Sequence, residues 1–266
     1  MRHTRPMSPI GFATPAVLIV VHGSRNSEWV SQQQNWFANV GNALREEFPG
    51  LRVELSFLEI TAPLFEDRFR ELSLEHEHLL VLPFFLVQGG HVLKDIPAIA
   101  DGCLADSHSY EIIGSDQFSV ALGVNAEHRL HVSHATTIDE IIVCGYGSSG
   151  SVAHWLQLIV DIRAHAGTFC DQPWHWAATG HFLPDSSAPL RSMIETLRAS
   201  GKRHLAILPL YLGISSYQND LIPRVMKEFP DVQFHFMPTS ILPDLRIERW
   251  AVDAIARALQ PRGVAP

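Results

Sequence analysis

The chain has 266 residues with 20 basic and 28 acidic side chains, which gives a formal net charge of −8 at pH 7. This balance argues against nucleic-acid binding, which needs a basic surface, and a composition of 46% hydrophobic and 18% charged residues excludes a disordered chain. Three cysteines without C-x-x-C spacing indicate neither a disulfide framework nor a thiolate zinc site, whereas 15 histidines make metal chemistry worth testing.

Short, continuous apolar runs alternate with helical patterns along the chain. Strands that are apolar on both faces are what a parallel sheet covered by helices requires, so this alternation predicts an α/β fold. The strongest predicted strands are 16–21, 79–86, 141–144 and 205–212, and weaker ones lie near 52–58, 111–113, 174–178 and 232–236. Helices are predicted near 29–48, 62–74, 93–104, 155–162, 188–199, 219–229 and 244–259.

The sequence resembles itself at a shift of about 125 residues. Residues 79–97 (LLVLPFFLVQGGHVLKDIP) align without a gap on residues 205–223 (LAILPLYLGISSYQNDLIP) at a shift of 126, and 21–24 (VHGS) align on 145–148 (GYGS) at a shift of 124. This repeat indicates an internal duplication, with two halves that each form one α/β unit. We expect two tandem doubly wound α/β lobes with mostly parallel four-stranded sheets.

The repeat and the polarity of the chain predict domain boundaries. Residues 1–15 are expected to be a flexible segment, 16–125 an N-terminal lobe, 126–137 a linker, and 138–260 a C-terminal lobe. The start of the chain lacks the apolar run of an export signal, and no stretch reaches the roughly 18 apolar residues that cross a bilayer. A cytoplasmic protein without a membrane partner is expected, and two lobes in one chain favour a monomer.

Two histidines of the first half have no counterpart in the second. His22 aligns with Tyr146 and His91 with Tyr217, although the surrounding apolar and proline residues are kept. Each histidine follows a predicted strand, and ligands of open α/β sheets bind outside the carboxyl ends of the strands. The two imidazoles are therefore expected to share one crevice, where they suit a divalent transition metal.

Glu59 is the third candidate ligand because it ends the predicted strand at 52–58. The shift of 126 places Asp185 opposite it in the second half. Two histidines and one carboxylate leave coordination positions open, unlike a closed structural zinc site. Capping of the next helix or orientation of a ligand is the alternative role for Glu59, so its role stays open at this point.

Three motifs resemble the class II, ATP-independent chelatases that insert cobalt or iron into sirohydrochlorin. They are VLIVVHGSRN at 17–26, FLEITAP at 57–63 and VLPFFLVQGGHVLKDIP at 81–97. The long form of that family is a tandem of two such halves in one bilobal molecule. The resemblance implies that His22 and His91 bind the metal and that Glu59 is the acidic residue between them. It also implies that the second half, with Tyr146 and Tyr217, mainly closes the substrate cleft.

The resemblance sets the expected partners as well. The substrates are a sirohydrochlorin-type tetrapyrrole and a divalent metal, Co²⁺ or Fe²⁺, with no permanently bound cofactor. A flat macrocycle edged with carboxylates calls for apolar walls, backbone N–H donors and a few cations. The residues expected to supply these are Ser24, Arg25, Gly89, Gly90 and Lys94 of the first half, and Gly147, Ser148, Ser149, Ser215 and Ser216 of the second.

Other interpretations of these motifs remain. An α/β hydrolase would use GYGSSG at 145–150 as a nucleophile turn, although the G-x-S-x-G pattern is missing. A metal or tetrapyrrole carrier would use the same histidines without catalysing insertion. His128, His131 and His134 have the spacing of one helix face, but no acidic or sulfur ligand accompanies them, so we interpret them as exposed linker residues. Gly89 and Gly90 fit either a turn with positive φ or a close approach of backbone to ligand.

Overall fold

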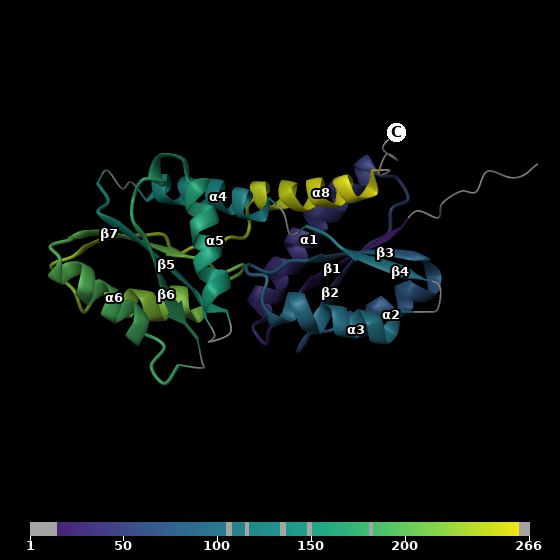
Figure 1. Cartoon of the computed structure of the whole chain (residues 1–266), viewed down its shortest axis with the longest axis horizontal. Helices are drawn as coiled ribbons and strands as arrows, with labels where there is room; N and C mark the ends of the chain where they lie inside the picture. The colour runs from purple at the N-terminus through teal and green to yellow at the C-terminus, as the bar shows by residue number, and fades with distance from the viewer. Residues whose placement is uncertain are drawn as a thin grey trace, which may run out of the picture.

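The computed structural model describes residues 15–104, 108–114, 117–133, 137–147, 151–180 and 183–260. Two lobes lie side by side, and each has a sheet with helices on both faces (Figure 1). Both sheets have four parallel strands, in the orders β2-β1-β3-β4 and β6-β5-β7-β8. The predicted fold class and the predicted duplication of the lobe are therefore confirmed.

The first sheet is built around β1, which is buried along its whole length. Val17 of β1 faces Val53 of β2 on one side and Leu80 of β3 on the other. The elements that form this half of the chain are β1 (Ala16–Val21), α1 (Ser27–Glu47), β2 (Val53–Phe57), α2 (Phe65–Glu75), β3 (His78–Pro83), the π-helix η1 (His91–Asp95), α3 (Ile96–Cys103), β4 (Ser109–Ile112) and α4 (Phe118–Val132).

The second half repeats this order. Its central strand β5 is buried except for its last residue, Tyr146, which is exposed. The elements are β5 (Glu140–Tyr146), α5 (Val152–Ala164), the 3₁₀ turn η2 (Gly167–Phe169), β6 (Trp174–Thr179), α6 (Ala188–Ala199), β7 (His204–Pro209), the π-helix η3 (Tyr217–Leu221), α7 (Ile222–Met226), β8 (Gln233–Phe236) and α8 (Leu245–Leu259). Among the described residues, no helix combines the length and the apolar character needed to span a bilayer.

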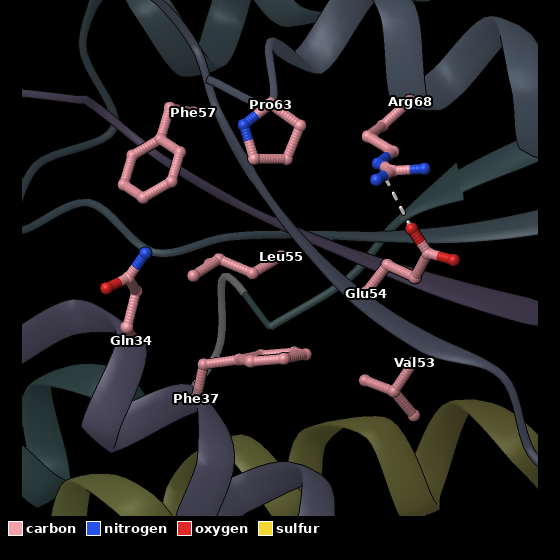
Figure 2. Close-up of a pocket in the computed structure, with 8 residues that line it drawn as sticks. All are labelled: Gln34, Phe37, Val53, Glu54, Leu55, Phe57, Pro63 and Arg68. Carbon is pink, nitrogen blue, oxygen red and sulfur yellow. Dashed lines mark ion pairs between the residues drawn. The ribbon is translucent and has the colours of Figure 1, made fainter. Parts of the chain in front are cut away.

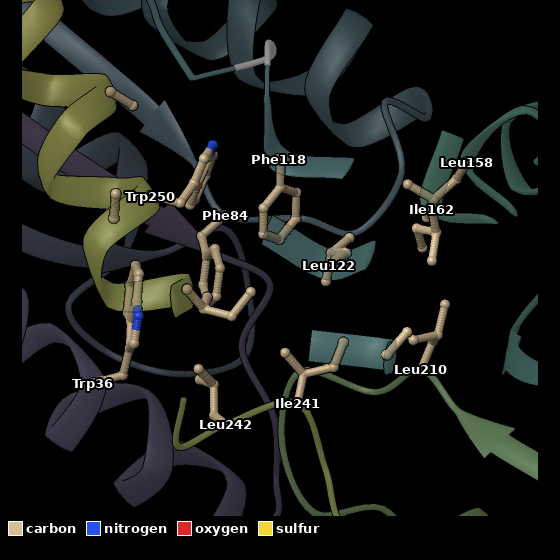
Figure 3. Packing of buried hydrophobic residues seen from close by; sticks show 14 of the residues in the cluster. Trp36, Phe84, Phe118, Leu122, Leu158, Ile162, Leu210, Ile241, Leu242 and Trp250 are labelled. Atoms are coloured by element: carbon tan, nitrogen blue, oxygen red, sulfur yellow. The ribbon is translucent and has the colours of Figure 1, made fainter. Parts of the chain in front are cut away.

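Alternate residues of the central strands pack into different cores, as the period of two in a strand requires. In β1, Leu18 and Val20 pack under α2 and α3, whereas Val17, Ile19 and Val21 belong to a core that continues into the other lobe. In the second lobe, the alternate residues of β5 divide in the same way between α6 with α7 and the shared core. One apolar core therefore joins the two lobes (Figure 3).

The last helix of each half packs on the opposite lobe. α4, which follows the last strand of the first sheet, packs against α5 and β7, whereas α8 packs against α1 and β3. The prediction of a linker at 126–137 is wrong over 126–132, because these residues continue α4. The predicted division at 125 also does not include the exchange of helices. Each lobe is covered by the last helix of the other half of the chain.

α4 is fixed on the second lobe by a fully buried cation. Arg129 donates from its two terminal nitrogens to the carbonyl oxygens of Pro209, at 2.7 Å, and Thr239, at 2.5 Å. Burial lowers the pKa of this guanidinium to about 10, and the nearby Asp244 opposes the shift. Pro209 ends β7 and Thr239 follows β8, so the helix is bound to that lobe by a charge as well as by apolar packing.

Candidate metal-transfer site

The structure brings His22, Glu59 and His91 together at the carboxyl ends of three neighbouring strands of the first sheet. His22 follows β1 directly, Glu59 lies two residues beyond β2, and His91 begins η1 after β3. The ring centroids of the two histidines are 5.0 Å apart at an interplanar angle of 73°. His22 Nε2 lies 3.3 Å from Glu59 Oε1.

Gly23 makes this close approach possible. Its φ is +102°, which favours glycine, and a Cβ atom at this position would lie 1.9 Å from the carbonyl oxygen of Glu59. The two loops are also hydrogen-bonded, because Glu59 N donates to His22 O at 3.1 Å. Thr61 Oγ1 adds two hydrogen bonds, accepting from Ser24 N at 3.1 Å and donating to Ser24 O at 3.0 Å. The sequence therefore positions His22 and Glu59 through the backbone.

Hydrogen bonds define which nitrogen of each histidine is available. His22 Nδ1 lies 3.0 Å from the carbonyl oxygen of Gly23, which can only accept, so Nδ1 carries the proton in the neutral ring. The lone pair of Nε2 then meets the carboxylate of Glu59, which is also an acceptor. Two acceptors at 3.3 Å repel each other unless a proton or a metal cation lies between them. This pair is consequently suited to bind either one.

His91 has a carboxylate on its second nitrogen. Its Nδ1 lies 2.7 Å from Asp95 Oδ2, one helical turn further along the chain. The carboxylate accepts the Nδ1 proton and leaves the Nε2 lone pair free for a metal, an arrangement that is common behind histidine ligands. Asp95 was missed in the sequence analysis, although its spacing of four residues from His91 could have indicated it.

The site is open to solvent. The side chains of His22, Glu59 and His91 are 41%, 50% and 44% exposed. Within the part of the chain that the structure describes, no three His, Cys, Asp or Glu side chains form a preformed metal cluster. An exposed pair of imidazoles with one adjacent carboxylate can bind a cation and also release it.

The other first-lobe residues predicted to bind substrate differ in how accessible they are to a ligand. Arg25 and Lys94 are exposed, and Ser24 is occupied in the loop, where its Oγ accepts from Asn26 N at 3.1 Å. Neither Gly89 nor Gly90 has a positive φ, so the turn interpretation is wrong, and a Cβ atom at Gly90 would meet open space. Backbone at Gly90 is therefore accessible to a ligand.

The predicted residues of the second half form a different environment. Ser215 is buried, and its Oγ lies 3.3 Å from the hydroxyl of Tyr146 and accepts from Tyr217 N at 3.2 Å. Ser215 therefore contacts two tyrosines in the free protein, and its contact with substrate stays a prediction. Ser148 and Ser149 lie outside the described residues.

Three aromatic rings of the second lobe reproduce the geometry of the histidine site. In the first lobe the ring centroid of Phe85 is 6.4 Å from that of His22 and 6.1 Å from that of His91. The repeat places Tyr146, Tyr211 and Tyr217 at these three positions, with centroid separations of 5.2, 5.3 and 6.3 Å.

The acidic position is not equivalent in the two lobes. Asp185, which the repeat places opposite Glu59, accepts hydrogen bonds from Ser187 and pairs with Arg191. These contacts lower the pKa of Asp185 to about 2, with the Ser187 hydroxyl as the largest cause. The second lobe therefore keeps the shape of the site without its imidazoles and with its carboxylate bound to other partners.

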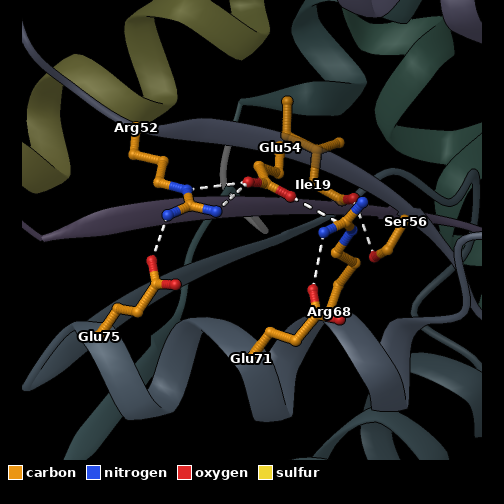
Figure 4. A network of polar contacts seen from close by, with 7 residues as sticks. All are labelled: Ile19, Arg52, Glu54, Ser56, Arg68, Glu71 and Glu75. Carbon is orange, nitrogen blue, oxygen red and sulfur yellow. Dashed lines mark hydrogen bonds and ion pairs between the residues drawn. The ribbon is translucent and has the colours of Figure 1, made fainter.

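A separate groove of about 280 Å³ lies along β2, between α1 and α2 (Figure 2). Neither histidine of the pair lines it, and neither does Glu59. Glu54 of the edge strand, which lines the groove, pairs with Arg52 and Arg68, and these two arginines contact Glu75 and Glu71 of α2 (Figure 4). Charges of this kind protect an edge strand from pairing with another chain. Because none of the three candidate ligands lines it, the groove is distinct from the candidate metal-transfer site.

Comparison with known proteins gives matches over most of the chain. Residues 16–135 match the CbiX family model. SirB of Bacillus subtilis subspecies spizizenii, solved in complex with cobalt, superposes with a TM-score of 0.66 at 18% identity over 95% of this chain and 98% of its own. SirB of Bacillus subtilis with Fe³⁺ gives a TM-score of 0.66 at 19% identity, over 93% of this chain and 96% of its own.

A third structure is CbiX, the terminal enzyme for biosynthesis of siroheme in denitrifying bacteria, with a TM-score of 0.61 at 14% identity. The superposition covers 92% of this chain and all of that one. No curated protein sequence gives a significant match. The two-lobed fold is thus similar to that of the sirohydrochlorin chelatase SirB. The segment that matches the CbiX family model, 16–135, contains all three predicted ligands.

Proposed function

We propose that this protein inserts Co²⁺ or Fe²⁺ into sirohydrochlorin without ATP, in cobalamin or sirohaem biosynthesis. The observation that carries the proposal is the pair formed by His22 and His91, whose rings are 5.0 Å apart and whose Nδ1 atoms both have acceptors. The Nε2 atoms are left to bind the ion. Cobalt and Fe³⁺ are the metals in the two SirB structures of similar fold.

The residues suit the chemistry of insertion. Two pyrrole N–H protons leave the macrocycle as the divalent ion enters, so the site must release a metal and accept protons. The pair of His22 Nε2 and Glu59 Oε1 holds one cation between two acceptors, and that cation can be the metal before insertion or a proton after it. An exposed position favours this exchange because the ligands do not enclose the ion.

Exposed apolar side chains on both lobes support a flat, apolar ligand. Ile60, next to Glu59, is 55% exposed, and Leu93, two residues after His91, is 58% exposed; Tyr146 of the second lobe is 48% exposed. Val152 and Leu156 extend this exposed apolar character along α5. Surfaces of this kind fit the faces of a tetrapyrrole, whereas Arg25 and Lys94 are available for its carboxylates.

The test is anaerobic absorbance spectroscopy of sirohydrochlorin with Co²⁺ or Fe²⁺. We expect the wild type to exceed the uncatalysed rate, and His22→Ala and His91→Ala to slow insertion by about 10- to 100-fold. His128→Ala is the matched control, because His128 is exposed on α4 and belongs to no part of the site. Wild-type insertion at the uncatalysed rate, with Co²⁺ bound through the same histidines, would identify a metal carrier instead.

A further inference from the structure

Ile60, next to Glu59, has an unusual backbone conformation. Its φ is +68°, and Thr61 N donates a hydrogen bond to Glu59 O at 2.7 Å, across Ile60. This combination is a γ-turn with a positive central φ, the rare and strained form of the turn. A β-branched side chain is among the least tolerated at a positive φ, because its branch crowds the backbone.

The surrounding hydrogen bonds impose this turn from both sides. Glu59 N is bonded to His22 O, and the Thr61 hydroxyl is bonded to the backbone of Ser24. These contacts fix the direction of the chain before and after Ile60. They do not require an isoleucine there, since glycine or asparagine adopts a positive φ at lower cost.

The isoleucine side chain gains little burial within the protein. It is 55% exposed and belongs to none of the buried core clusters of the described residues. Burial of this side chain within the free protein therefore compensates neither for the strain of the turn nor for the cost of exposing an apolar group to water. Ile60 directly follows Glu59, whose carboxylate lies beside His22. A ligand bound at this site is therefore the candidate to cover the isoleucine side chain.

We propose that Ile60 contacts the apolar face of the macrocycle in the complex with substrate. This inference rests on the proposed function and adds a residue that determines affinity for the tetrapyrrole. Binding covers the side chain that the free protein leaves exposed, so part of the cost of the strained turn is recovered only when the ligand is present. Strain and affinity are thus linked at one residue.

The experiment measures folding and binding in the same variants. Ile60→Asn relieves the strain and removes the apolar contact, whereas Ile60→Leu keeps an apolar side chain without the β-branch. We expect Ile60→Asn to unfold at a higher denaturant concentration than the wild type, and to bind metal-free sirohydrochlorin about tenfold more weakly in a fluorescence titration. Ile60→Leu should keep affinity within about twofold of the wild type.

Gln117 provides the matched control, because it is exposed and has a similar φ of +61° at the start of α4. Gln117→Asn should also raise stability, with no change in affinity for sirohydrochlorin. Unchanged or lower stability of Ile60→Asn overturns the role of strain, and unchanged affinity overturns the contact with substrate. Either result leaves metal insertion by the wild type standing, whereas a wild type that does not bind sirohydrochlorin overturns the proposed function and this inference together.

Discussion

Single backbone positions determine whether the candidate metal-transfer site can form. Gly23 is one of them, since it combines a positive φ with a close approach to the carbonyl of Glu59. Its place directly after His22 was evident from the sequence, but its contact with the second loop was not. The histidines themselves were predictable, because each follows an apolar strand and is replaced by tyrosine in the repeat.

Gly23→Ala separates steric overlap from backbone strain. Gly50 has a φ of +89° but no atom within 4 Å of a Cβ position, so Gly50→Ala isolates the cost of the positive φ. We expect Gly50→Ala to lower the free energy of unfolding by about 1 kcal/mol and Gly23→Ala by about 3 kcal/mol or more. Equilibrium denaturation in urea measures both. Equal losses would show that the contact with Glu59 is unimportant.

Asp95 is expected to act through His91. Asp95→Ala removes the acceptor of the Nδ1 proton, so the ring can turn or change tautomer, and Co²⁺ affinity should fall by about tenfold. Stability should stay within about 0.5 kcal/mol of the wild type because Asp95 is half exposed. Titration with Co²⁺ gives the affinity, and Glu66→Ala on α2 serves as a control that breaks an exposed ion pair only. Unchanged affinity in Asp95→Ala contradicts this role.

Among the elements, the exchanged helices were the hardest to predict. The second half of α4 falls in a polar, histidine-bearing stretch, which predicts a linker, and its apolar residues do not lie on one face. Phe118, Leu122 and Leu130 are buried, but Val120 and Val124 are partly exposed, and two histidines interrupt the pattern. α8 has a clear apolar face and was predicted, yet its sequence does not say which lobe that face covers.

Trp250 of α8 lies in an aromatic cluster formed by three helices and the residue that follows β3 (Figure 3). Its ring centroid is 4.2 Å from that of Phe118 and 6.0 Å from that of Phe84, which in turn stacks on Trp36 at 4.0 Å. Trp250→Ala should therefore cost about 3–5 kcal/mol of unfolding free energy. Leu245→Ala, on the same helix but 79% exposed, should change it by less than about 0.5 kcal/mol. A small loss in Trp250→Ala contradicts the packing of α8 on the first lobe.

A buried histidine of β8 makes stability depend on pH. Burial lowers the pKa of His235 below its usual 6.5, and a positive charge on His204 would lower it further, while the carbonyl of Thr137 opposes the shift. The unfolded chain then binds more protons than the native protein just below pH 6.5, so the free energy of unfolding falls as the pH drops.

Urea denaturation at several pH values from about 7.5 to about 5 tests this dependence. His235→Phe keeps a ring in the core and should show a smaller loss of stability on acidification than the wild type. His128→Asn replaces an exposed histidine and should keep the wild-type loss. If the free energy of unfolding falls with pH equally in His235→Phe and the wild type, His235 is not the cause of the pH dependence.

At the scale of the whole molecule, the duplicated α/β fold was predictable because apolar strands and helices recur in the same order in both halves. The packing of one lobe on the other was not predictable from the sequence. The core between them is formed by every second residue of strands that lie more than 100 positions apart in the chain. Val17 and Ile19 of the first sheet share a core with Ile141 and Val143 of the second. This core should make the lobes unfold together.

One cooperative transition is therefore expected on heating. The calorimetric enthalpy should equal the van't Hoff enthalpy, and amide hydrogens in β1 and β5 should exchange with similar free energies of opening. Trp250→Ala should shift protection of both strands. Two resolved transitions, or loss of protection in β1 alone, would show that the lobes fold as independent units.

The crossing of α4 and α8 also bears on how such a chain arises. α4 relates to α5 and β7 as α8 relates to α1 and β3, and the two crossing helices contact each other. This reciprocity is the pattern of a closed pair with approximate twofold symmetry. Two identical single lobes that each packed the terminal helix on the other would have the same arrangement, so joining two such copies in one chain would conserve every one of these helix contacts.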